Sequence, residues 1–237
     1  MKKEILKLEN VHCGYGTRPV LNGITLSLDA GETVLLAGPN GCGKSTLLKA
    51  VIGALPLSEG SIAFEGKTFT HEAVEKRVNL GIGYLRQTGN IFPSLTVREN
   101  LDLAGLSLAP NELRHAIERV LSTFDFLKDR LASRAGTLSG GQRQALAIAM
   151  VFLHKRKLYL LDEPTAGLAP KTARDIMERV RQLSESDPEQ AVLIVEHRLE
   201  LLHWVNRAVI LIQGQIKAET ADSTRFLDPE WLAKHYF

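Results

Sequence analysis

Alternating apolar and polar residues near the start of the chain predict strands with one face in water. Residues 5–11 alternate in this way, and residues 20–29 do so again. Residues 13–19 contain two glycines and a proline, so we expect a turn there and antiparallel pairing of the two strands. A further short antiparallel strand with its own turn is expected at 61–66.

Continuous apolar runs follow, and they predict strands buried on both faces. Such runs are found at 33–37, 80–85, 157–163, 191–196 and 207–212. Stretches with helical spacing or helical character lie at 46–52, 142–153, 171–184, a short segment reaching Val205, and 223–237. Strands that alternate with helices predict a mostly parallel sheet, and a hairpin is expected where 207–212 meets 215–219.

The character of the chain changes between residues 90 and 134, where no strand pattern is found. Pro110 gives a start signal for a helix inside this stretch. We therefore expect a single domain over 1–237, in which 90–134 is an inserted helical subdomain. Residues 1–89 and 135–237 would form the core together with a small antiparallel β subdomain.

Composition places the chain among ordinary globular proteins. Of its 237 residues, 44% are hydrophobic and 24% are charged, and the formal net charge is +2. So small a charge gives no reason to expect a nucleic-acid partner, and the basic cluster at 154–157 is typical of a solvated helix end. Cys13 and Cys42 fit a reduced, cytoplasmic compartment. We expect no signal peptide and no membrane span, so any membrane role would act through a partner.

The strongest chemical signal lies between the predicted strand at 33–37 and the helix after it. The pattern G-x-x-x-x-G-K-[ST] is typical of a phosphate loop, in which glycines and backbone N–H groups surround an anion. We expect Lys44 to reach the β- and γ-phosphates of a nucleoside triphosphate and Ser45 to bind Mg²⁺. The alternative is a glycine-rich turn with an exposed lysine. The expected nucleotide-binding residues are Gly38, Pro39, Asn40, Gly41, Cys42, Gly43, Lys44, Ser45 and Thr46.

Two adjacent carboxylates end the apolar strand at 157–163. Asp162 would emerge at the carboxyl edge of the sheet, where open α/β sheets bind ligands, and could hold Mg²⁺. Glu163 points in another direction and could polarise the attacking water. The alternative is that both residues merely cap the next segment.

Residues 138–142 make the interpretation specific, because they resemble the signature motif of ABC-type ATPases. The phosphate loop, Gln87 after a strand, the signature, the acidic strand and His197 follow one another in that family's order, and the resemblance spans nearly the whole chain. It implies an α/β fold of the P-loop NTPase class. The signature residues are Leu138, Ser139, Gly140, Gly141 and Gln142.

The resemblance also implies a role for single residues. Tyr15 matches the aromatic residue that stacks on adenine. His197 matches the histidine that contacts the γ-phosphate, and with Glu163 and Lys44 it makes up the expected catalytic residues. Gln87 matches the glutamine that bridges Mg²⁺ and the helical subdomain. Taken alone, Tyr15 could be a surface tyrosine, His197 a structural histidine and Gln87 an ordinary loop residue.

The third metal ligand and the partner chain follow from the same resemblance. Gln87 would join Ser45 and Asp162 at Mg²⁺. Ser139 and the glycines after it open a helix, so they offer N–H groups and a positive helix end to the ATP bound by a second chain. That chain is expected to be a second copy or a homologous ATPase subunit, with two ATP molecules between them.

Two positions depart from the family pattern. Ala169 stands where many relatives carry an aspartate, and Met150 stands where arginine is common. The stretch at 87–101 and the residues around Ala169 are similar to the ATPases of branched-chain amino acid importers. Within that stretch, Phe92 and Leu95 are expected either to contact a permease or to belong to the core of the helical subdomain.

The expected function is that of a cytoplasmic ATPase subunit, peripheral on the membrane, which drives a separate permease for amino acids or similar small solutes. One alternative is a non-transport ABC ATPase of the DNA-repair or translation type, but such relatives usually carry a coiled-coil insert or two cassettes. Another is the ATPase of an export system. A P-loop switch protein is less compatible with the signature at 138–142.

Overall fold

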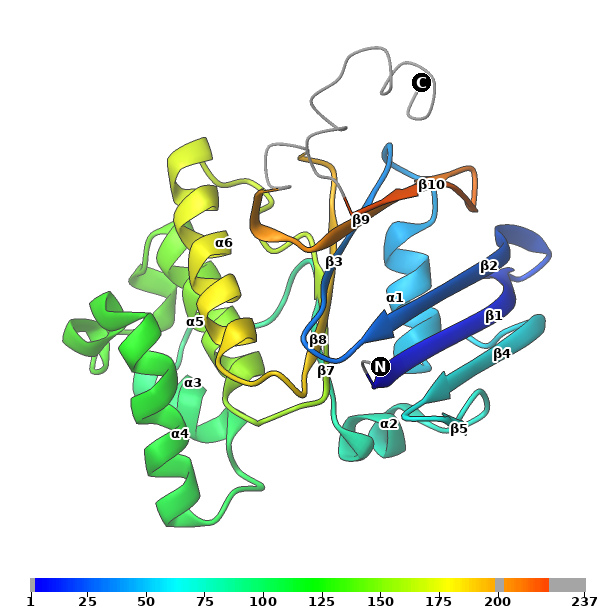
Figure 1. Ribbon diagram of the computed structural model, residues 1–237. Coiled ribbons are helices and arrows are strands. Elements are labelled where there is room, and N and C mark those ends of the chain that lie inside the picture. The colour runs from blue at the N-terminus through cyan, green and yellow to red at the C-terminus, as the bar shows by residue number, and fades with distance from the viewer. Residues whose placement is uncertain (1–2, 199–202, 222–237) are drawn as a thin grey trace.

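A mostly parallel β-sheet forms the centre of the molecule (Figure 1). The computed structural model describes residues 3–198 and 203–221, and within them this sheet has the order β10-β9-β3-β8-β7-β6. The hairpin of β9 and β10 is antiparallel, and the other neighbouring strands run parallel. The strands are β3 (Thr33–Ala37), β6 (Ile82–Leu85), β7 (Leu158–Asp162), β8 (Ala191–Glu196), β9 (Arg207–Ile212) and β10 (Gln215–Thr220).

Both faces of this sheet are covered, which explains the continuous apolar runs. Every residue of β3, β7 and β8 is buried. Successive side chains of β3 enter two different cores, Val34 and Leu36 on one face and Leu35 and Ala37 on the other. This is the period of two that a strand imposes on its side chains.

One face packs on α1 (Lys44–Ile52), and a second, antiparallel sheet lies beyond that helix (Figure 1). The second sheet has the order β2-β1-β4-β5. Leu47, Leu48 and Val51 of α1 belong to the core that the two sheets share. The strands of this sheet are β1 (Glu4–Tyr15), β2 (Arg18–Asp29), β4 (Glu59–Phe64) and β5 (Lys67–Thr68).

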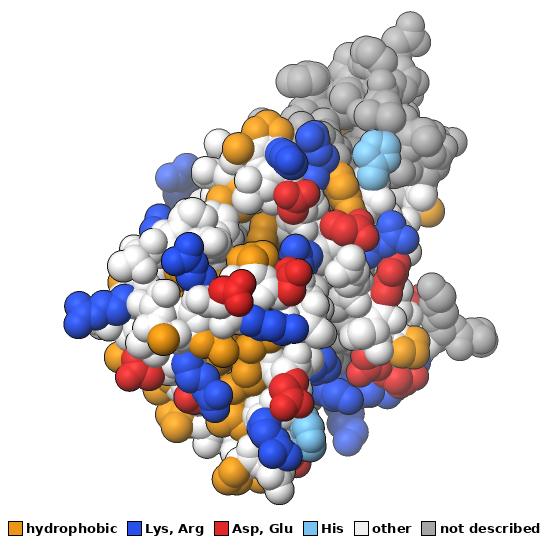
Figure 2. All heavy atoms as spheres, turned by 90° about the vertical axis from the view of Figure 1, so that its left-hand side faces the viewer, with side chains coloured by type: hydrophobic (Ala, Val, Ile, Leu, Met, Phe, Trp, Pro, Cys, Tyr) orange, Lys and Arg blue, Asp and Glu red, His pale blue; other side chains and the backbone are white. Residues whose placement is uncertain are grey.

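Helices cover the opposite face of the central sheet (Figure 1). On this side of the molecule, apolar side chains gather between Lys or Arg and Asp or Glu side chains (Figure 2). None of the helices within 3–198 and 203–221 combines the length and the apolar character of a membrane span. The helices of this layer are α3 (Val97–Ala104), α4 (Pro110–Thr123), α5 (Gly140–Phe152) and α6 (Pro170–Glu185).

The stretch at 90–134 contains α3, α4 and the 3₁₀ segment η1 (Asp125–Arg130). The chain lies against itself where this stretch begins and ends. The Ala135 N–H donates to the Leu95 carbonyl over 2.8 Å, and Val97 N lies 2.9 Å from the Ser133 carbonyl oxygen. A segment inserted into a domain must begin and end at neighbouring positions, and this stretch does so. Its bounds at residues 90 and 134 are our interpretation.

The expected turn at 13–19 is wrong in extent. Strand β1 continues to Tyr15 and β2 already begins at Arg18, so only residues 16 and 17 form the turn. Gly14 makes this possible, because a Cβ there would lie 2.0 Å from the Arg18 carbonyl oxygen. Glycine therefore serves close strand pairing at this position.

The expected fold class is confirmed, whereas two helices have no counterpart among the predicted elements. They are α2 (Val74–Leu80), which follows β5, and α3, which lies inside the stretch expected to be helical but was not predicted as a separate helix. Of the expected helices near the end of the chain, the one reaching Val205 lies in part outside the described residues. The one over 223–237 lies wholly outside them.

Candidate functional site

The phosphate loop connects β3 to α1 at the carboxyl edge of the central sheet. Gly41 and Gly43 have φ angles of 79° and 112°, in the left-handed region that glycine favours. Gly38 lies so close to β9 that a Cβ would be 2.2 Å from the Leu211 carbonyl oxygen. Because α1 begins at Lys44, the N–H groups of its first turn are available to an anion in the loop.

Lys44 is buried inside this loop, with 5% of its surface exposed. Its Nζ donates to the Gly38 carbonyl over 2.7 Å and to the Pro39 carbonyl over 3.0 Å. Both partners are neutral, so the ammonium charge is not neutralised by these contacts. A buried cation held only by carbonyls is well suited to receive a phosphate.

Asp162 lies at the end of β7 and faces the start of α1. Ser45 Oγ donates to Asp162 Oδ1 over 2.8 Å, and the Tyr84 hydroxyl lies 3.5 Å from Oδ2. Burial raises the pKa of the Asp162 carboxyl, while the hydrogen bond from Ser45 acts in the opposite direction. A buried carboxylate whose hydrogen-bond donors are hydroxyls would be stabilised by a bound cation.

Glu163 departs from the strand direction directly after Asp162. Its φ of 49° is uncommon for a residue other than glycine, and its N–H donates to the Val195 carbonyl over 2.9 Å. Gln87 Nε2 donates to Glu163 Oε2 over 2.9 Å. Glu163 also lines a cavity of about 130 Å³ together with phosphate-loop residues between 40 and 46. The structure thus brings Gln87 and Glu163 close to the phosphate loop.

Tyr15 lies at the end of β1 with 48% of its surface exposed. Lys49 Nζ donates to its hydroxyl over 3.2 Å and lies 5.6 Å from the ring centroid. The ring lines a cavity of about 520 Å³ together with Cys42 and Thr46. An exposed ring beside the phosphate loop is available for stacking on a base.

The turn between β9 and β10 holds the phosphate loop from the other side. The Gly214 N–H donates to the Cys42 carbonyl over 2.9 Å, and the Gly214 carbonyl accepts from the Asn22 N–H over 2.8 Å. A Cβ on Gly214 would lie 1.9 Å from the Val20 carbonyl oxygen, so only glycine fits. This turn therefore contacts both the loop and β2.

The signature residues at 138–142 begin α5. Ser139 is the N-cap, and its Oγ accepts from the Gln142 N–H over 3.3 Å. The Gln142 side chain in turn accepts from the Ser139 N–H over 3.1 Å, which completes a capping box. Neither cavity beside the phosphate loop is lined by these residues. Within one chain, the structure does not bring the signature to the loop.

His197 follows β8 directly, and 45% of its side chain is exposed. Its Nδ1 lies 3.8 Å from Oε2 of Glu196, a residue with no exposed surface. Burial raises the pKa of Glu196. We singled out neither Glu196 nor Tyr84 from the sequence. The available signal was a polar residue within or at the end of a buried strand.

Ala169 and Met150, the two positions that depart from the family pattern, lie in different surroundings. Ala169 is the N-cap of α6 and offers no side-chain acceptor to the helix. Met150 is half-buried at the edge of the core between the sheet and its helices. Nothing in the structure explains why methionine stands there.

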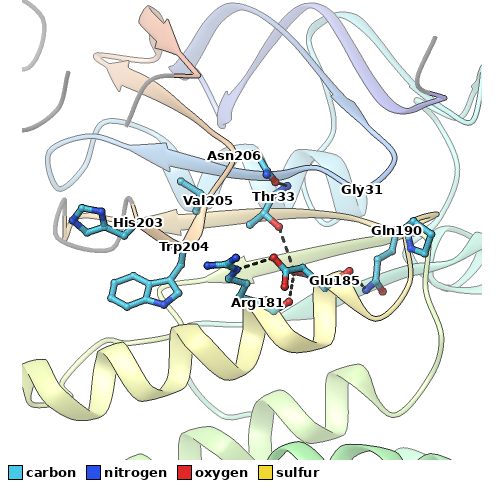
Figure 3. A pocket seen from close by; sticks show the side chains of 11 residues that line it. Gly31, Thr33, Arg181, Glu185, Gln190, His203, Trp204, Val205 and Asn206 are labelled. Atoms are coloured by element: carbon cyan, nitrogen blue, oxygen red, sulfur yellow. Dashed lines mark hydrogen bonds and ion pairs between the residues drawn. The ribbon is translucent and has the colours of Figure 1, made fainter. Parts of the chain in front are cut away.

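A separate cavity of about 370 Å³ lies at the amino end of β3 (Figure 3). It is lined by Thr33, by residues of α6 and by the segment 203–206. The Gln190 amide in its wall donates to the carbonyls of Leu183 and Ser184, over 2.7 Å each. None of the predicted site residues lines this cavity.

Comparison with known proteins agrees with the geometry. The sequence profile of the family described as "ABC transporter" matches residues 21–166. The chain is 35% identical over 213 residues to the probable branched-chain amino acid transport ATP-binding protein LivF of Archaeoglobus fulgidus, with 90% of each chain covered. It is 33% identical over 226 residues to the high-affinity branched-chain amino acid transport ATP-binding protein BraG of Pseudomonas aeruginosa, covering 95% of this chain and 97% of BraG.

Solved structures are similar over almost the whole chain. MJ1267, an ATP-binding cassette of an ABC transporter, superposes with a TM-score of 0.87 at 30% identity and covers 97% of this chain and 98% of its own. The ATP-binding cassette MJ0796, in a dimeric post-hydrolysis state bound to ADP and Pi, gives a TM-score of 0.79 at 27% identity, covering 91% of this chain and 98% of its own. The fold, the matched profile and the relatives lead to one conclusion: the chain belongs to the ABC transporter family, as an ATP-binding ATPase.

Proposed function

We propose that this chain and a second copy, or a homologous ATPase subunit, close head to tail around two ATP molecules. Hydrolysis of ATP would drive a separate membrane permease that imports amino acids or similar small solutes. The observation that carries the proposal is that five side chains lie close together at the carboxyl edge of the central sheet: Lys44, Ser45, Gln87, Asp162 and Glu163.

Binding of the nucleotide follows from the loop and the exposed ring. Phosphate oxygens would replace the carbonyl partners of Lys44 and accept from the N–H groups at the start of α1. Tyr15 would stack on adenine at the other end of the nucleotide. The cavity lined by Tyr15, Cys42 and Thr46 connects these two positions.

The residues present fit a Mg²⁺ ion. Ser45 and Asp162 are already in contact, and the Gln87 amide lies beside the adjacent carboxylate. A hydroxyl, a carboxylate and an amide oxygen are hard oxygen donors, which Mg²⁺ prefers. When bound, the ion would neutralise phosphate charge and so facilitate attack on the γ-phosphoryl group.

In the proposed mechanism, Glu163 activates the attacking water. Its carboxylate would accept a proton from the water whose oxygen bonds to the γ-phosphorus, while the bond from that phosphorus to the oxygen of ADP breaks. ADP and inorganic phosphate result. Gln87, which donates to Glu163, would fix the direction of that carboxylate, and His197 would donate to a γ-phosphoryl oxygen.

The second chain would complete the site. The N-terminus of α5 begins at an exposed Ser139 and lines neither cavity at its own chain's loop. The N–H groups of Gly140 and Gly141, which the capping box does not use, could therefore meet the γ-phosphate of the opposite chain. Such contacts are made only while the γ-phosphate is present. ATP would therefore favour the closed pair, and hydrolysis would open it.

The proposed place of action is the cytoplasmic face of the membrane, through contact with a permease. Phe92 is 51% exposed, which supports a contact surface more than a core position, whereas Leu95 is half-buried. The apolar side chains on the face seen in Figure 2 offer further contact area. The relatives named for branched-chain amino acid transport support import of such solutes.

Glu163→Gln tests the mechanism. We expect the variant to bind ATP, to lose hydrolysis by at least about 100-fold, and to form a dimer with ATP and Mg²⁺ that is stable in light scattering. Glu118→Gln, which changes an exposed residue of α4 in the same way, should behave as the unchanged protein. A Glu163→Gln chain that stays monomeric at saturating ATP would contradict the proposed dimer.

Transport needs its own measurement. The complex purified from native membranes should contain a permease. In vesicles that hold the ATPase subunits and ATP on the inside, it should accumulate branched-chain amino acids inside. ATP-dependent efflux would support the export alternative instead.

A further inference from the structure

Glu196 is a buried acidic residue that the proposed mechanism leaves without a function. Its side chain has no exposed surface, although it ends β8 only one residue before His197. Its Oε1 accepts two hydrogen bonds from Thr165, from the N–H over 2.9 Å and from the hydroxyl over 2.5 Å. Oε2 is buried without a hydrogen-bond partner among the described residues.

A buried, unpartnered carboxylate oxygen is costly, so its surroundings should reveal its partner. The polar group placed to approach Oε2 is Nδ1 of His197, at 3.8 Å. That distance is too long for a hydrogen bond, but the exposed imidazole could approach by a small rotation. Burial raises the pKa of the Glu196 carboxyl, while the two hydrogen bonds from Thr165 and, more weakly, the neighbouring imidazole oppose this shift.

We propose that Glu196 is a positioning residue that ties His197 to the loop after Glu163. Oε2 accepts the Nδ1–H of His197 and so turns Nε2 towards the nucleotide, while Oε1 holds Thr165. This inference rests on the proposed function, because it takes His197 as the residue that contacts the γ-phosphate. A carboxylate on Nδ1 fixes the ring orientation and decides which nitrogen carries the proton.

The contacts around Thr165 show why one carboxylate can serve two segments. Thr165 is fully buried two positions after Glu163. Three residues further on, the Leu168 carbonyl accepts from the Arg198 guanidinium over 3.1 Å. The loop that leaves the acidic strand is therefore joined twice to the segment that holds His197. When the ring also donates from Nε2 to a phosphoryl oxygen, it carries both protons, and Glu196 supplies the compensating charge.

Glu196→Gln is the informative variant, because its amide oxygen can still accept from Thr165 while its NH₂ group cannot accept the Nδ1–H. We expect an unchanged melting temperature, a kcat for ATP hydrolysis at least tenfold lower, and a KM for ATP within about twofold of the original. His197→Ala should lower kcat too, and the double variant should be no worse than His197→Ala alone. Glu118→Gln, which changes an exposed residue of α4 in the same way, is the matched control, and its kcat should stay near the original.

A second measurement does not depend on hydrolysis. The ¹⁵N shifts of the His197 ring in the nucleotide-free protein should show a protonated Nδ1, and Glu196→Gln should abolish that preference. Unchanged kcat and unchanged ring shifts in Glu196→Gln would overturn the proposal, as would additive effects in the double variant. If the unaltered chain does not hydrolyse ATP at all, the proposed function fails, whereas the ring shifts still test the contact between Glu196 and His197.

Discussion

Ser45 Oγ lies 2.8 Å from Asp162 Oδ1, and this hydrogen bond joins two residues that are 117 positions apart in the sequence. It connects the first turn of α1 to the end of β7, two elements that share the carboxyl edge of the central sheet. Ligands of open α/β sheets bind at this edge. The two side chains are thus already adjacent where a metal–nucleotide complex would be held.

Asp162→Asn should separate binding of the ion from stability of the fold. The amide oxygen can still accept from Ser45, but the charge that would attract Mg²⁺ is lost, so we expect ATP hydrolysis to fall at least about 100-fold. Because burial raises the pKa of Asp162, the ionised form is disfavoured in the fold. The nucleotide-free variant at pH 7 should be at least as stable to urea as the original. Clear destabilisation would show that the carboxylate is needed for folding.

Tyr15→Ala should weaken ATP binding through loss of stacking. Stacking of an exposed ring is worth about 1 kcal/mol, which corresponds to an affinity about fivefold lower. Tyr15→Phe keeps the ring and removes the contact of the hydroxyl with Lys49, so its affinity should stay near the original. Titration with a fluorescent ATP analogue measures both, and equal loss in the two variants would assign the effect to the hydroxyl.

Ala169→Asp should stabilise the chain. Ala169 is the N-cap of α6 and has no side-chain acceptor, whereas aspartate could accept from an N–H of the first helical turn. We expect a gain of about 1 kcal/mol in the free energy of unfolding. Ala169→Leu, which offers no acceptor, is the control. If denaturant curves of the two variants coincide, the helix end does not benefit from a cap.

Cys13 predicts a specific loss of stability in alkali. Cys13 is 2% exposed, and burial raises the pKa of its thiol to about 11. In the unfolded chain the pKa is about 8.5, so above that pH the unfolded chain loses a proton that the folded chain retains. This contribution is therefore complete below about pH 8.5 and is lost as the pH rises to about 11. Cys13→Val should show a shallower decrease in melting temperature over this range, and parallel curves would exclude the effect.

Much of the fold could be predicted because the relevant elements are simple. The bounds of β3 and β8 follow from short runs in which every side chain is apolar or at a strand end, and both strands are buried throughout. The helix α2 gave no such signal. It has only seven residues, and its buried residue is Arg77, whose guanidinium donates to the carbonyls of Ala50 and Val51 at the end of α1. Hydropathy cannot identify a core position occupied by arginine.

The candidate site divides in the same way. Gly38 to Thr46, Asp162 and Glu163 could be predicted because local motifs demand fixed residue types at fixed spacing. Glu196 and Tyr84 could not, because their contacts are made across strands and depend on burial that the sequence does not display. In the proposed dimer the signature would contact the phosphate loop of a second chain, so a single chain would contain only half of that contact.

The Gly214 turn has a mechanical consequence. Its N–H holds the phosphate loop, and its carbonyl holds β2 of the antiparallel sheet. Because these backbone hydrogen bonds allow little movement, we expect that the antiparallel sheet cannot rotate relative to the central sheet without displacing the phosphate loop. A displacement of the antiparallel sheet would thus also displace the phosphate loop.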